Sequence, residues 1–413
     1  MRVLNFGSCN IDCVYSVDRI VRPGETVAAD DLKLYAGGKG LNQSIALSRA
    51  KVSVFHAGCI GQDGEMLREL LLSCGVNTDY LITVGKKTGQ AIIQVDGTGE
   101  NSIVLYSGAN FAVSRDYVDS VLSDFKSGDF LLLQNEISEL AYIIDRAYEI
   151  GMKIMLNPSP FQKSLKELDL NKLTYLILNE TEAAGFSGMS EPEEFIVWVR
   201  KKYPKLCVIL TLGDKGSTCF CGDMRVYQPA FDVKAVDTTA AGDTFTGYFA
   251  AGMIGGKTIE KSLEYASAAA ALAVTKNGAA PSIPELDAVE RSLGYLIARS
   301  GDETRQKTET VNKYFENHLK DASVAGLSVL LGYSESYTGR WLHNNLSMSF
   351  SELLIDARCK KAAHYLKTTD LPVSEIIGLA GYRNESFLRK AFLKKYGCTP
   401  FEYRKKEKTK NDK

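Results

Sequence analysis

The chain has 413 residues, of which 45% are hydrophobic and 24% charged, a composition typical of a folded globular protein with room for two or more domains. This excludes a disordered or collagen-like chain, and no apolar run approaches the roughly 18 to 20 residues of a membrane-spanning helix. The amino terminus, MRVLNFGSCNIDCV, has the pattern of a strand rather than of a signal peptide, so we expect a cytoplasmic protein without membrane contact.

The net charge of −1 hides a difference between the two ends of the chain. Residues 1–302 carry 29 basic and 37 acidic side chains, a net charge of −8, whereas residues 303–413 carry 20 basic and 13 acidic ones, a net charge of +7. A basic carboxy-terminal module fits a nucleic-acid-binding domain, although it also fits an ordinary solvated surface. The nine cysteines are odd in number and widely spaced, which predicts reduced thiols, and no paired Cys-x-x-Cys unit indicates zinc.

Up to about residue 298, short apolar runs alternate with helical patterns. The runs that predict strands are VLNFGS, VSVFHAG, DFLLLQNE, KIMLNPSP, LTYLILNE and CVILTLG, and helices are predicted at residues 41–50 and 65–74. This alternation predicts an α/β sandwich around a mainly parallel sheet. Residues 12–36 and 88–107 have hairpin patterns instead, which predicts a small antiparallel β lid over one edge of the sheet.

Several polar residues fall where such a fold places ligands. Asn10 and Asp12 follow the first strand at its carboxyl end, and their spacing puts both side chains on one side of an extended segment. A Gly-Gly-Lys-Gly turn at residues 37–40 precedes a helix that carries Asn42, and Glu136 ends the strand of LLLQNE. Together these groups suit a polyhydroxylated ligand.

A second candidate site is the segment DTTAAGDTF at residues 237–245. Its small residues lead directly into a helix, whose first N–H groups and dipole would attract an anion. Asp243 would repel that anion, unless it takes a proton from a substrate hydroxyl while the helix end stabilises a transferred phosphoryl group. An aspartate that merely caps its helix explains the pattern equally well.

Residues 299–310 contain no bulky apolar side chain and no periodicity, which predicts a surface linker between domains at 1–298 and 311–406. Beyond it only helical patterns occur. Helices at 324–331 and 335–346 flank a Gly-Tyr-Ser turn in which Ser334 is the expected N-cap, and a similar pair spans 373–380 and 385–396. Two helix-turn-helix units could place recognition helices in successive major-groove segments, although most helix pairs bind nothing. Residues 407–413 are predicted to be a basic tail.

Nine motifs occur in order in the first domain: GSCNIDCV, RPGETV, AGGKGLNQSIALSRA, GENSIVLYSGAN, LNPSP, LNETEA, TLGDKGS, DTTAAGDTF and AVTKNGAAPSIP. With them, residues 1–298 resemble the PfkB family of carbohydrate kinases, and the ribokinases within it. The resemblance implies a ribokinase-like α/β sandwich whose lid often pairs two subunits into a homodimer. It also implies ATP-dependent phosphorylation of a sugar, most closely D-ribose to D-ribose 5-phosphate, with Mg²⁺ and K⁺.

The resemblance further assigns roles to individual residues. Asp243 would be the catalytic base, and Ala240, Ala241 and Gly242 would form the anion hole. Ala240 stands where many members have glycine, and we expect it to be tolerated because a helical first turn needs no positive φ. The sugar would lie against Asn10, Asp12, Gly38, Lys39, Gly40, Asn42, Glu136 and Asp243. The nucleotide would lie against Asn179, Thr211, Gly213, Asp214, Gly216, Gly242 and Ser267. Asn179 and Glu182 would organise Mg²⁺, and the potassium loop would comprise Asp237, Thr239, Ala273, Lys276, Gly278 and Ser282.

Residues 311–406 resemble an AraC-type DNA-binding domain, most closely through ARCKKAAHYLKTTDLPVSEIIGLAGYRNESFLRKAFLKKYGCTPFEYR. Ser328 and Thr338 depart from it, because alanine and leucine are usual there. Trp341 and Phe387 are expected in the cores of the two units. The residues that would face double-stranded DNA are Glu335, Ser336 and Arg340 in the first unit, and Arg383, Asn384, Glu385, Ser386, Arg389 and Lys390 in the second.

Two functions fit this domain order. One is an active sugar kinase that also binds DNA and regulates transcription, and the other is a sugar-responsive regulator whose kinase fold is only a sensor. A sensor could dispense with the base, the anion hole or the cation loop, yet the sequence retains all three, which favours catalysis.

Overall fold

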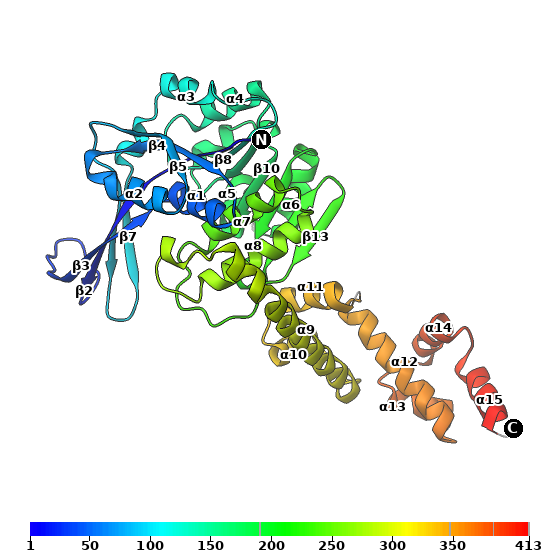
Figure 1. Cartoon of the computed structure of the whole chain (residues 1–413). Helices are drawn as coiled ribbons and strands as arrows, with labels where there is room; N and C mark the ends of the chain where they lie inside the picture. The colour runs from blue at the N-terminus through cyan, green and yellow to red at the C-terminus, as the bar shows by residue number, and fades with distance from the viewer. Residues whose placement is uncertain (190, 347, 383, 412–413) are drawn as a thin grey trace. The chain divides into compact units, whose positions relative to one another are not determined.

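The computed structural model describes residues 1–189, 191–346, 348–382 and 384–411, with residues 300–303 and 407–411 described through their backbone only. The chain divides into two compact units, Met1–Ile297 and Ala298–Lys413, which we describe separately (Figure 1). In the described part of the chain, no helix is both long and apolar enough to span a bilayer.

The centre of the first unit is a mixed sheet, which within the described residues has nine strands in the order β13-β12-β11-β10-β9-β8-β1-β4-β5. The strands from β11 to β5 are parallel, and β12 and β13 add an antiparallel edge. Their bounds are β1 Val3–Phe6, β4 Val54–Ile60, β5 Asn77–Thr83, β8 Phe130–Gln134, β9 Lys153–Asn157, β10 Tyr175–Asn179, β11 Cys207–Thr211, β12 Ser217–Cys221 and β13 Met224–Gln228.

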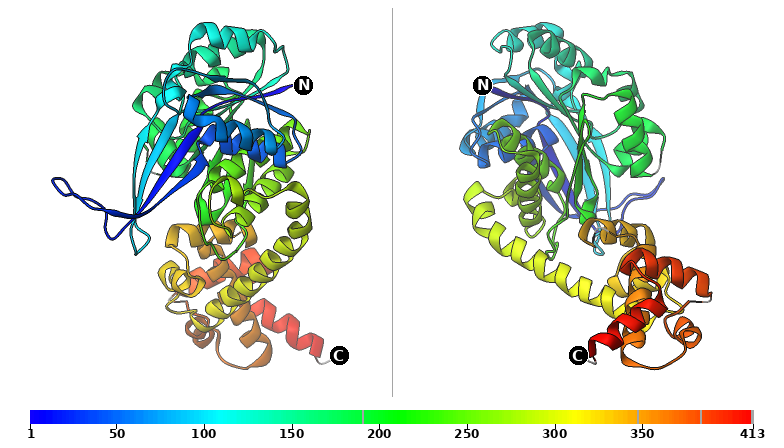
Figure 2. Two further views of the ribbon diagram at one scale, coloured as in Figure 1. Left: turned by 60° about the vertical axis from the view of Figure 1, so that its left-hand side comes forward. Right: turned by 90° about the vertical axis from the view of Figure 1, so that its right-hand side faces the viewer.

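Helices cover both faces of this sheet (Figure 2). Alternate residues of each central strand enter different apolar clusters: Leu4 and Phe6 of β1 pack in one and Val3 in the other. Burial on both faces is why these strands read as continuous apolar runs in the sequence. One face is covered by α3 Arg115–Leu122, α4 Leu140–Ile150, α5 Glu180–Ser187 and α6 Pro192–Lys202. The other is covered by α1 Lys39–Arg49, α2 Glu65–Ser73, α7 Ala241–Ile254, α8 Ile259–Ala273 and the start of α9 Leu286–Asn317.

The predicted lid is a separate sheet with the order β3-β2-β6-β7. Its strands are β2 Asn10–Val17, β3 Ala29–Gly37, β6 Gly89–Val95 and β7 Asn101–Tyr106. Each hairpin is antiparallel, but β2 pairs in parallel with β6. The lid is therefore mixed rather than antiparallel throughout, because the two hairpins meet through their first strands, which run in the same direction.

Contrary to the expectation that all cysteines are reduced, Cys207 and Cys221 form a disulfide between β11 and β12. Val208 pairs with Phe220, so the next residues outward on these antiparallel strands are the two cysteines, with Cα atoms 4.3 Å apart. Sequence spacing alone could not reveal this proximity, because it depends on the strand register.

Within its described residues, the second unit consists of helices, as predicted, and contains two small cores. The predicted helix-turn-helix units are both present, with Gly332 and Gly381 supplying the positive φ angles, 70° and 82°, that their turns require. One helix, α12, packs in both cores and joins the units. The described helices are the second part of α9, residues 298–317, followed by α10 Val324–Leu331, α11 Glu335–Leu346, α12 Phe350–Thr368, α13 Val373–Leu379, α14 Glu385–Tyr396 and α15 Pro400–Asn411.

The residues predicted as a linker and as a basic tail are helical in the structure. Residues 299–310 lie within α9, and residues 407–411 end α15. The linker sequence lacks proline and is rich in Glu, Arg, Gln and Lys, which are good helix formers even without an apolar face.

Two departures from the AraC pattern explain each other. Ser328 of α10 and Thr338 of α11 are both buried, and their hydroxyl oxygens lie 2.8 Å apart. The Ser328 hydroxyl also lies 2.8 Å from the Val324 carbonyl oxygen. A hydrogen-bonded polar pair thus replaces an apolar contact in the first unit.

Candidate functional site

The amino terminus of α1 is held against the segment between β1 and β2. A side chain at Gly40 would place its Cβ 2.3 Å from the backbone nitrogen of Ser8, so only glycine allows this approach. Gly38 has a φ of 95°, which likewise favours glycine. A Cβ at Gly38 would lie 3.0 Å from the backbone nitrogen of Asn10, whose side-chain oxygen accepts a hydrogen bond from Asn110 at 2.7 Å.

Acidic side chains surround Lys39. The Glu136 carboxylate accepts hydrogen bonds from the Ser8 hydroxyl and from the Lys39 backbone N–H, and burial raises the pKa of Glu136. The charge of Asp243, followed by those of Glu136 and Glu182, raises the pKa of Lys39 against the opposing effect of burial. The Lys39 ammonium is therefore stabilised in its charged form by these carboxylates, which makes it a suitable anchor for hydroxyl groups and phosphate oxygens.

Asp12 lies opposite the β3 end of the lid. A Cβ at Gly37 would lie 2.1 Å from the Asp12 carboxylate oxygen, so glycine leaves the space that this carboxylate fills. Burial, and secondly the charge of Glu136, raises the pKa of Asp12 to about 7. Asp12 can thus change protonation state near neutral pH.

Helix α7 begins at Ala241, and Ala240 is its N-cap residue with φ 59° and ψ 9°. The expectation that Ala240 needs no positive φ is wrong, because Ala240 precedes the first turn instead of belonging to it. A non-glycine residue in this left-handed region is strained by about 1 kcal/mol. The cap has no side-chain hydrogen bond, so the first N–H groups of the helix are not covered by a capping side chain.

The Asp243 carboxylate is held by two side-chain amides from α1. Asn42 Nδ2 donates to its Oδ2 at 3.0 Å, and Gln43 Nε2 donates to its Oδ1 at 2.9 Å. Asp243 is only 6% exposed and lies in the first turn of α7, while Ala240 occupies the cap position. This geometry does not match the alternative of a simple helix cap. Gln43 was not predicted as a site residue, although it stands directly after Asn42 in the same motif.

All seven residues expected for the nucleotide line one pocket with a volume of about 410 Å³. They are Asn179, Thr211, Gly213, Asp214, Gly216, Gly242 and Ser267. The remaining wall is mostly apolar and includes Phe231, Val233 and Phe245, which carried no signal in the sequence because apolar residues there read as ordinary core. An apolar wall with few polar groups suits a nucleobase.

Asn179 and Glu182 form a capping box at the start of α5. The Asn179 side chain accepts from the Glu182 backbone N–H, and a Glu182 carboxylate oxygen accepts from the Asn179 backbone N–H, both at 2.9 Å. Glu182 is 5% exposed. The box fixes both side chains and leaves one Glu182 oxygen for a further partner.

The residues of the expected potassium loop are also brought together. The Asp237 carboxylate accepts from the backbone N–H groups of Thr239 and Gly278, both at 2.8 Å, which joins the segment before α7 to the one after α8. Ala273 and Ser282 are buried, whereas the Lys276 side chain is exposed. Lys276 can therefore offer its backbone carbonyl, not its ammonium, to this loop.

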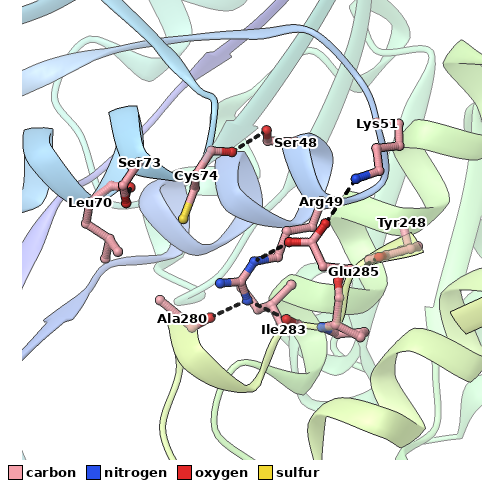
Figure 3. Close-up of polar contacts among 11 residues, drawn as sticks. Ser48, Arg49, Lys51, Leu70, Ser73, Cys74, Tyr248, Ala280, Ile283 and Glu285 are labelled. Atoms are coloured by element: carbon pink, nitrogen blue, oxygen red, sulfur yellow. Dashed lines mark hydrogen bonds and ion pairs between the residues drawn. The ribbon is translucent and has the colours of Figure 1, made fainter. Parts of the chain in front are cut away.

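A cluster of polar contacts fixes the segment that follows this loop (Figure 3). The Arg49 guanidinium, at the end of α1, donates to the carbonyl oxygens of Ala280, at 2.8 Å, and of Ile283. It also pairs with Glu285, which Lys51 contacts at 3.2 Å. Helices α1 and α7 both take part, since Tyr248 donates to the carbonyl of Pro284 at 2.7 Å. The helices that carry Asn42 and Asp243 in their first turns thus also hold residues 280–285, through Arg49 at the end of α1 and Tyr248 in the middle of α7.

In the second unit, most of the predicted DNA-facing residues are exposed. Exposed ones are Glu335, Ser336, Asn384, Glu385, Ser386, Arg389 and Lys390, Arg340 is half-buried, and Arg383 lies outside the described residues. Ser334 and Asn384 cap the two recognition helices, since their side chains accept from the backbone N–H groups of Tyr337 and Ser386. Trp341 lies in a core as predicted, but Phe387 is 67% exposed, because it lies on the flank of α14 away from Leu388 and Phe392.

Comparison with known proteins gives results for both units. Residues 2–286 match the model of the pfkB family carbohydrate kinases, and residues 327–406 match a helix-turn-helix domain. The ribokinase of Haemophilus influenzae is 37% identical over 288 residues, which are 67% of this chain and 94% of that protein. The deoxyribokinase of Salmonella typhi is 32% identical over 70% of this chain and 97% of its own length. The structure of Arabidopsis thaliana ribokinase complexed with ribose and ATP matches with a TM-score of 0.63 at 32% identity, covering 71% of this chain and 98% of that one.

Proposed function

Because this chain belongs to the pfkB family of carbohydrate kinases, we propose that its first unit transfers a phosphoryl group from ATP to D-ribose, giving D-ribose 5-phosphate. The observation that supports this proposal is the buried Asp243 carboxylate in the first turn of α7. Two side-chain amides of α1 hold this carboxylate, and Ala240, not Asp243, occupies the cap position. A carboxylate so placed can take a proton from the primary hydroxyl of the sugar, while the N–H groups of Ala241 and Gly242 stabilise charge on the transferred group.

The sugar would lie between Asp243 and the groups around Lys39. Asn42 supports this placement, because its buried Oδ1 has no hydrogen-bond partner among the described residues and is free to accept from a sugar hydroxyl. Asn10, Asp12 and Glu136 would complete the site. Ribose is our choice over deoxyribose, since identity to the H. influenzae ribokinase, 37%, exceeds identity to the S. typhi deoxyribokinase, 32%.

ATP would bind in the pocket beside α7, since the seven predicted nucleotide residues line it. Its terminal phosphate would point to the N-terminus of α7, where the N–H groups lack a capping side chain. The oxygen of Glu182 that the capping box leaves over suits a hard cation, so Asn179 and Glu182 fit Mg²⁺ held largely through water and phosphate. When bound, Mg²⁺ supplies charge neutralisation of the phosphates.

The loop around Asp237 fits K⁺ by the chemistry of its donors. A carboxylate, a buried hydroxyl on Ser282 and several backbone carbonyls are oxygen ligands, which a hard monovalent cation prefers. Bound there, K⁺ would add positive charge beside the N-terminus of α7. Asp237, Thr239, Ala273, Lys276, Gly278 and Ser282 would hold it.

The test is ATP-dependent phosphorylation of a pentose and hexose panel with Mg²⁺ and K⁺, comparing wild type with Asp243→Asn. We expect ribose to be the best substrate, and we expect the variant to lose several orders of magnitude in kcat while still binding ribose. Ribose binding without turnover of any sugar would refute the kinase proposal. It would support the alternative of a sugar-responsive regulator.

We further propose that the AraC-type second unit binds double-stranded DNA in sequence-specific fashion and regulates transcription. Arg389 and Lys390 are exposed on α14, and the exposed Phe387 ring beside them could contact a thymine methyl group. Arg389→Ala should weaken binding to the selected operator by about tenfold. Lys205→Ala is the matched control, because it removes one exposed cation from the first unit. Equal effects of the two variants in a fluorescence anisotropy titration would refute the assignment.

A homodimer through the lid is also part of the proposal. The outer strands of the lid expose apolar side chains, among them Leu34 at 54%, Ile103 at 53% and Val104 at 61%. A patch of this kind is common at subunit interfaces. Leu34→Asp should convert a dimer to a monomer in sedimentation velocity, and a monomeric wild type would refute this part. A cytoplasmic location follows from the same proposal, since ATP and DNA are both available there.

A further inference from the structure

Gln43 connects Asp243 to a chain of buried amides in the sheet. Its Nε2 donates to Asp243 Oδ1 at 2.9 Å and to Asn157 Oδ1 at 3.1 Å, and its Oε1 accepts from Gln134 Nε2 at 2.7 Å. Gln134 Nε2 also donates to Asn5 Oδ1 at 2.9 Å. Gln43, Gln134 and Asn5 are each 0% exposed, so no water competes for these contacts.

Two backbone carbonyls determine which way every amide in this chain points. A carbonyl oxygen can only accept, so Asn5 must turn its NH₂ group to the Gly40 oxygen, at 2.7 Å, and its Oδ1 to Gln134. Gln134 must then present Nε2, which in turn requires Gln43 to present Oε1 on that side. The NH₂ group of Gln43 is left facing Asp243.

The second carbonyl gives the same answer from the opposite direction. Asn157 Nδ2 donates to the Ile177 carbonyl oxygen at 3.0 Å, so Asn157 turns its Oδ1 to Gln43. That oxygen again requires the NH₂ group of Gln43, whose two hydrogens are thereby assigned to Asn157 and Asp243. Reversing Gln43 would oppose oxygen to oxygen at two contacts and nitrogen to nitrogen at a third.

We propose that Gln43 is a positioning residue, which holds the Asp243 carboxylate in one orientation as an acceptor so that its other lone pairs face the sugar hydroxyl. This inference rests on the proposed kinase function. Asn42 also donates to Asp243, but its Oδ1 has no partner among the described residues, so nothing else fixes its orientation before the sugar binds. In the free enzyme, Gln43 is therefore the residue that fixes the orientation of the Asp243 carboxylate. A fixed base lowers the barrier because it needs no reorganisation when the proton moves.

The experiment compares Gln43→Leu with Ser44→Ala in the full chain. Ser44 is the matched control, because it is the next residue of α1 and contacts Asn5 and His56 in the same buried network without touching Asp243. We expect Gln43→Leu to lower kcat for ribose by about 10- to 100-fold, while the ribose Kd from calorimetry changes by less than about threefold. Ser44→Ala should lower the melting temperature but keep kcat within about threefold.

A second readout separates positioning from general loosening. Loss of a donor disfavours the ionised carboxylate, so the acid limb of the kcat–pH profile should move to higher pH in Gln43→Leu and stay in place in Ser44→Ala. If Gln43→Leu does not fold, Gln43→Asn keeps an amide that is one methylene too short, and the same loss of kcat is expected.

The inference is overturned if kcat of the Gln43 variant stays within about threefold of wild type, or if both variants lose kcat equally with unmoved pH profiles. In either case wild-type turnover still supports the kinase. A wild type that phosphorylates no sugar overturns the proposed function and this inference together.

Discussion

Removing both hydroxyls of the buried pair in the first helix-turn-helix unit should cost less than the summed costs of the two single variants. The two substitutions are Ser328→Ala and Thr338→Val, and the second keeps the shape of the side chain while removing its hydroxyl. Each deletes one partner of the 2.8 Å contact between α10 and α11.

The structure allows the size of each effect to be worked out. Thr338→Val leaves the Ser328 hydroxyl with its second partner, the Val324 carbonyl, so the loss is about 1 kcal/mol, one ordinary hydrogen bond. Ser328→Ala leaves the Thr338 hydroxyl, which is 0% exposed, without a hydrogen-bond partner, so the cost is about 1 to 3 kcal/mol. In the double variant neither hydroxyl remains buried without a partner. We therefore expect its cost to be about 1 kcal/mol below the sum of the two single-variant costs, which is the coupling free energy.

Urea unfolding monitored by tryptophan fluorescence measures these values in the intact chain. The chain has two tryptophans, and Trp341 lies in the same core as Leu327 and Leu342 of this unit. A Trp198→Phe background leaves Trp341 as the reporter. Additive single-variant costs, with coupling below about 0.3 kcal/mol, would refute the reasoning, because they would show that the hydroxyls do not depend on each other.

Three further predictions concern pH and cations. Burial lowers the pKa of His56 to about 4, so neutral His56 contributes stability that is fully present above its ordinary pKa of about 6.5 and is lost as the pH falls through 4. In urea unfolding, the free energy of unfolding of wild type should fall over this pH range, and that of His56→Gln should not. Because the pKa of Asp12 is raised to about 7, its effect on stability has the opposite pH dependence: the contribution is greatest below about pH 4 and is lost as the pH rises through 7. The ribose Kd from calorimetry should decrease from pH 6 to 8 in wild type and stay constant in Asp12→Asn. Arg49→Gln should raise the K⁺ concentration for half-maximal activity by about tenfold, because the carbonyl oxygens of Ala280 and Ile283, on either side of Ser282, lose a charged hydrogen-bond donor. An unchanged K⁺ response, measured with choline as the replacement ion, would separate Arg49 from the cation loop.

Much of the fold could be predicted because its signals are local. The buried strands read as apolar runs, and the helix-turn-helix units were placed to within a residue by their glycine turns and by Ser334. What failed depended on relations between distant segments. The Cys207–Cys221 pairing depends on strand register, and the parallel contact between β2 and β6 depends on how two hairpins meet.

The candidate site shows the same division. Asn42 and Asp243 stood out through their motifs, but Gln43 and Gln134 did not, because neutral amides in a sequence do not reveal which carboxylate they will meet. Ala240 was misjudged because the helix begins one residue later than expected, which moves it from the first turn to the cap. Phe387 was misjudged because an aromatic residue beside core positions reads as core, and only the helix phase shows otherwise.

The amide chain behind Asp243 also bears on any attempt to transplant this site. A designer who copied only Asp243, Asn42 and Gln43 into a new scaffold would reproduce the contacts but leave Gln43 free to flip. The orientation is set farther from Asp243, by the main-chain oxygen of Gly40 acting through Asn5 and Gln134, and by that of Ile177 acting through Asn157. A transferable version of the site therefore includes a piece of the parallel sheet, and its smallest unit is larger than the set of side chains that meet the sugar.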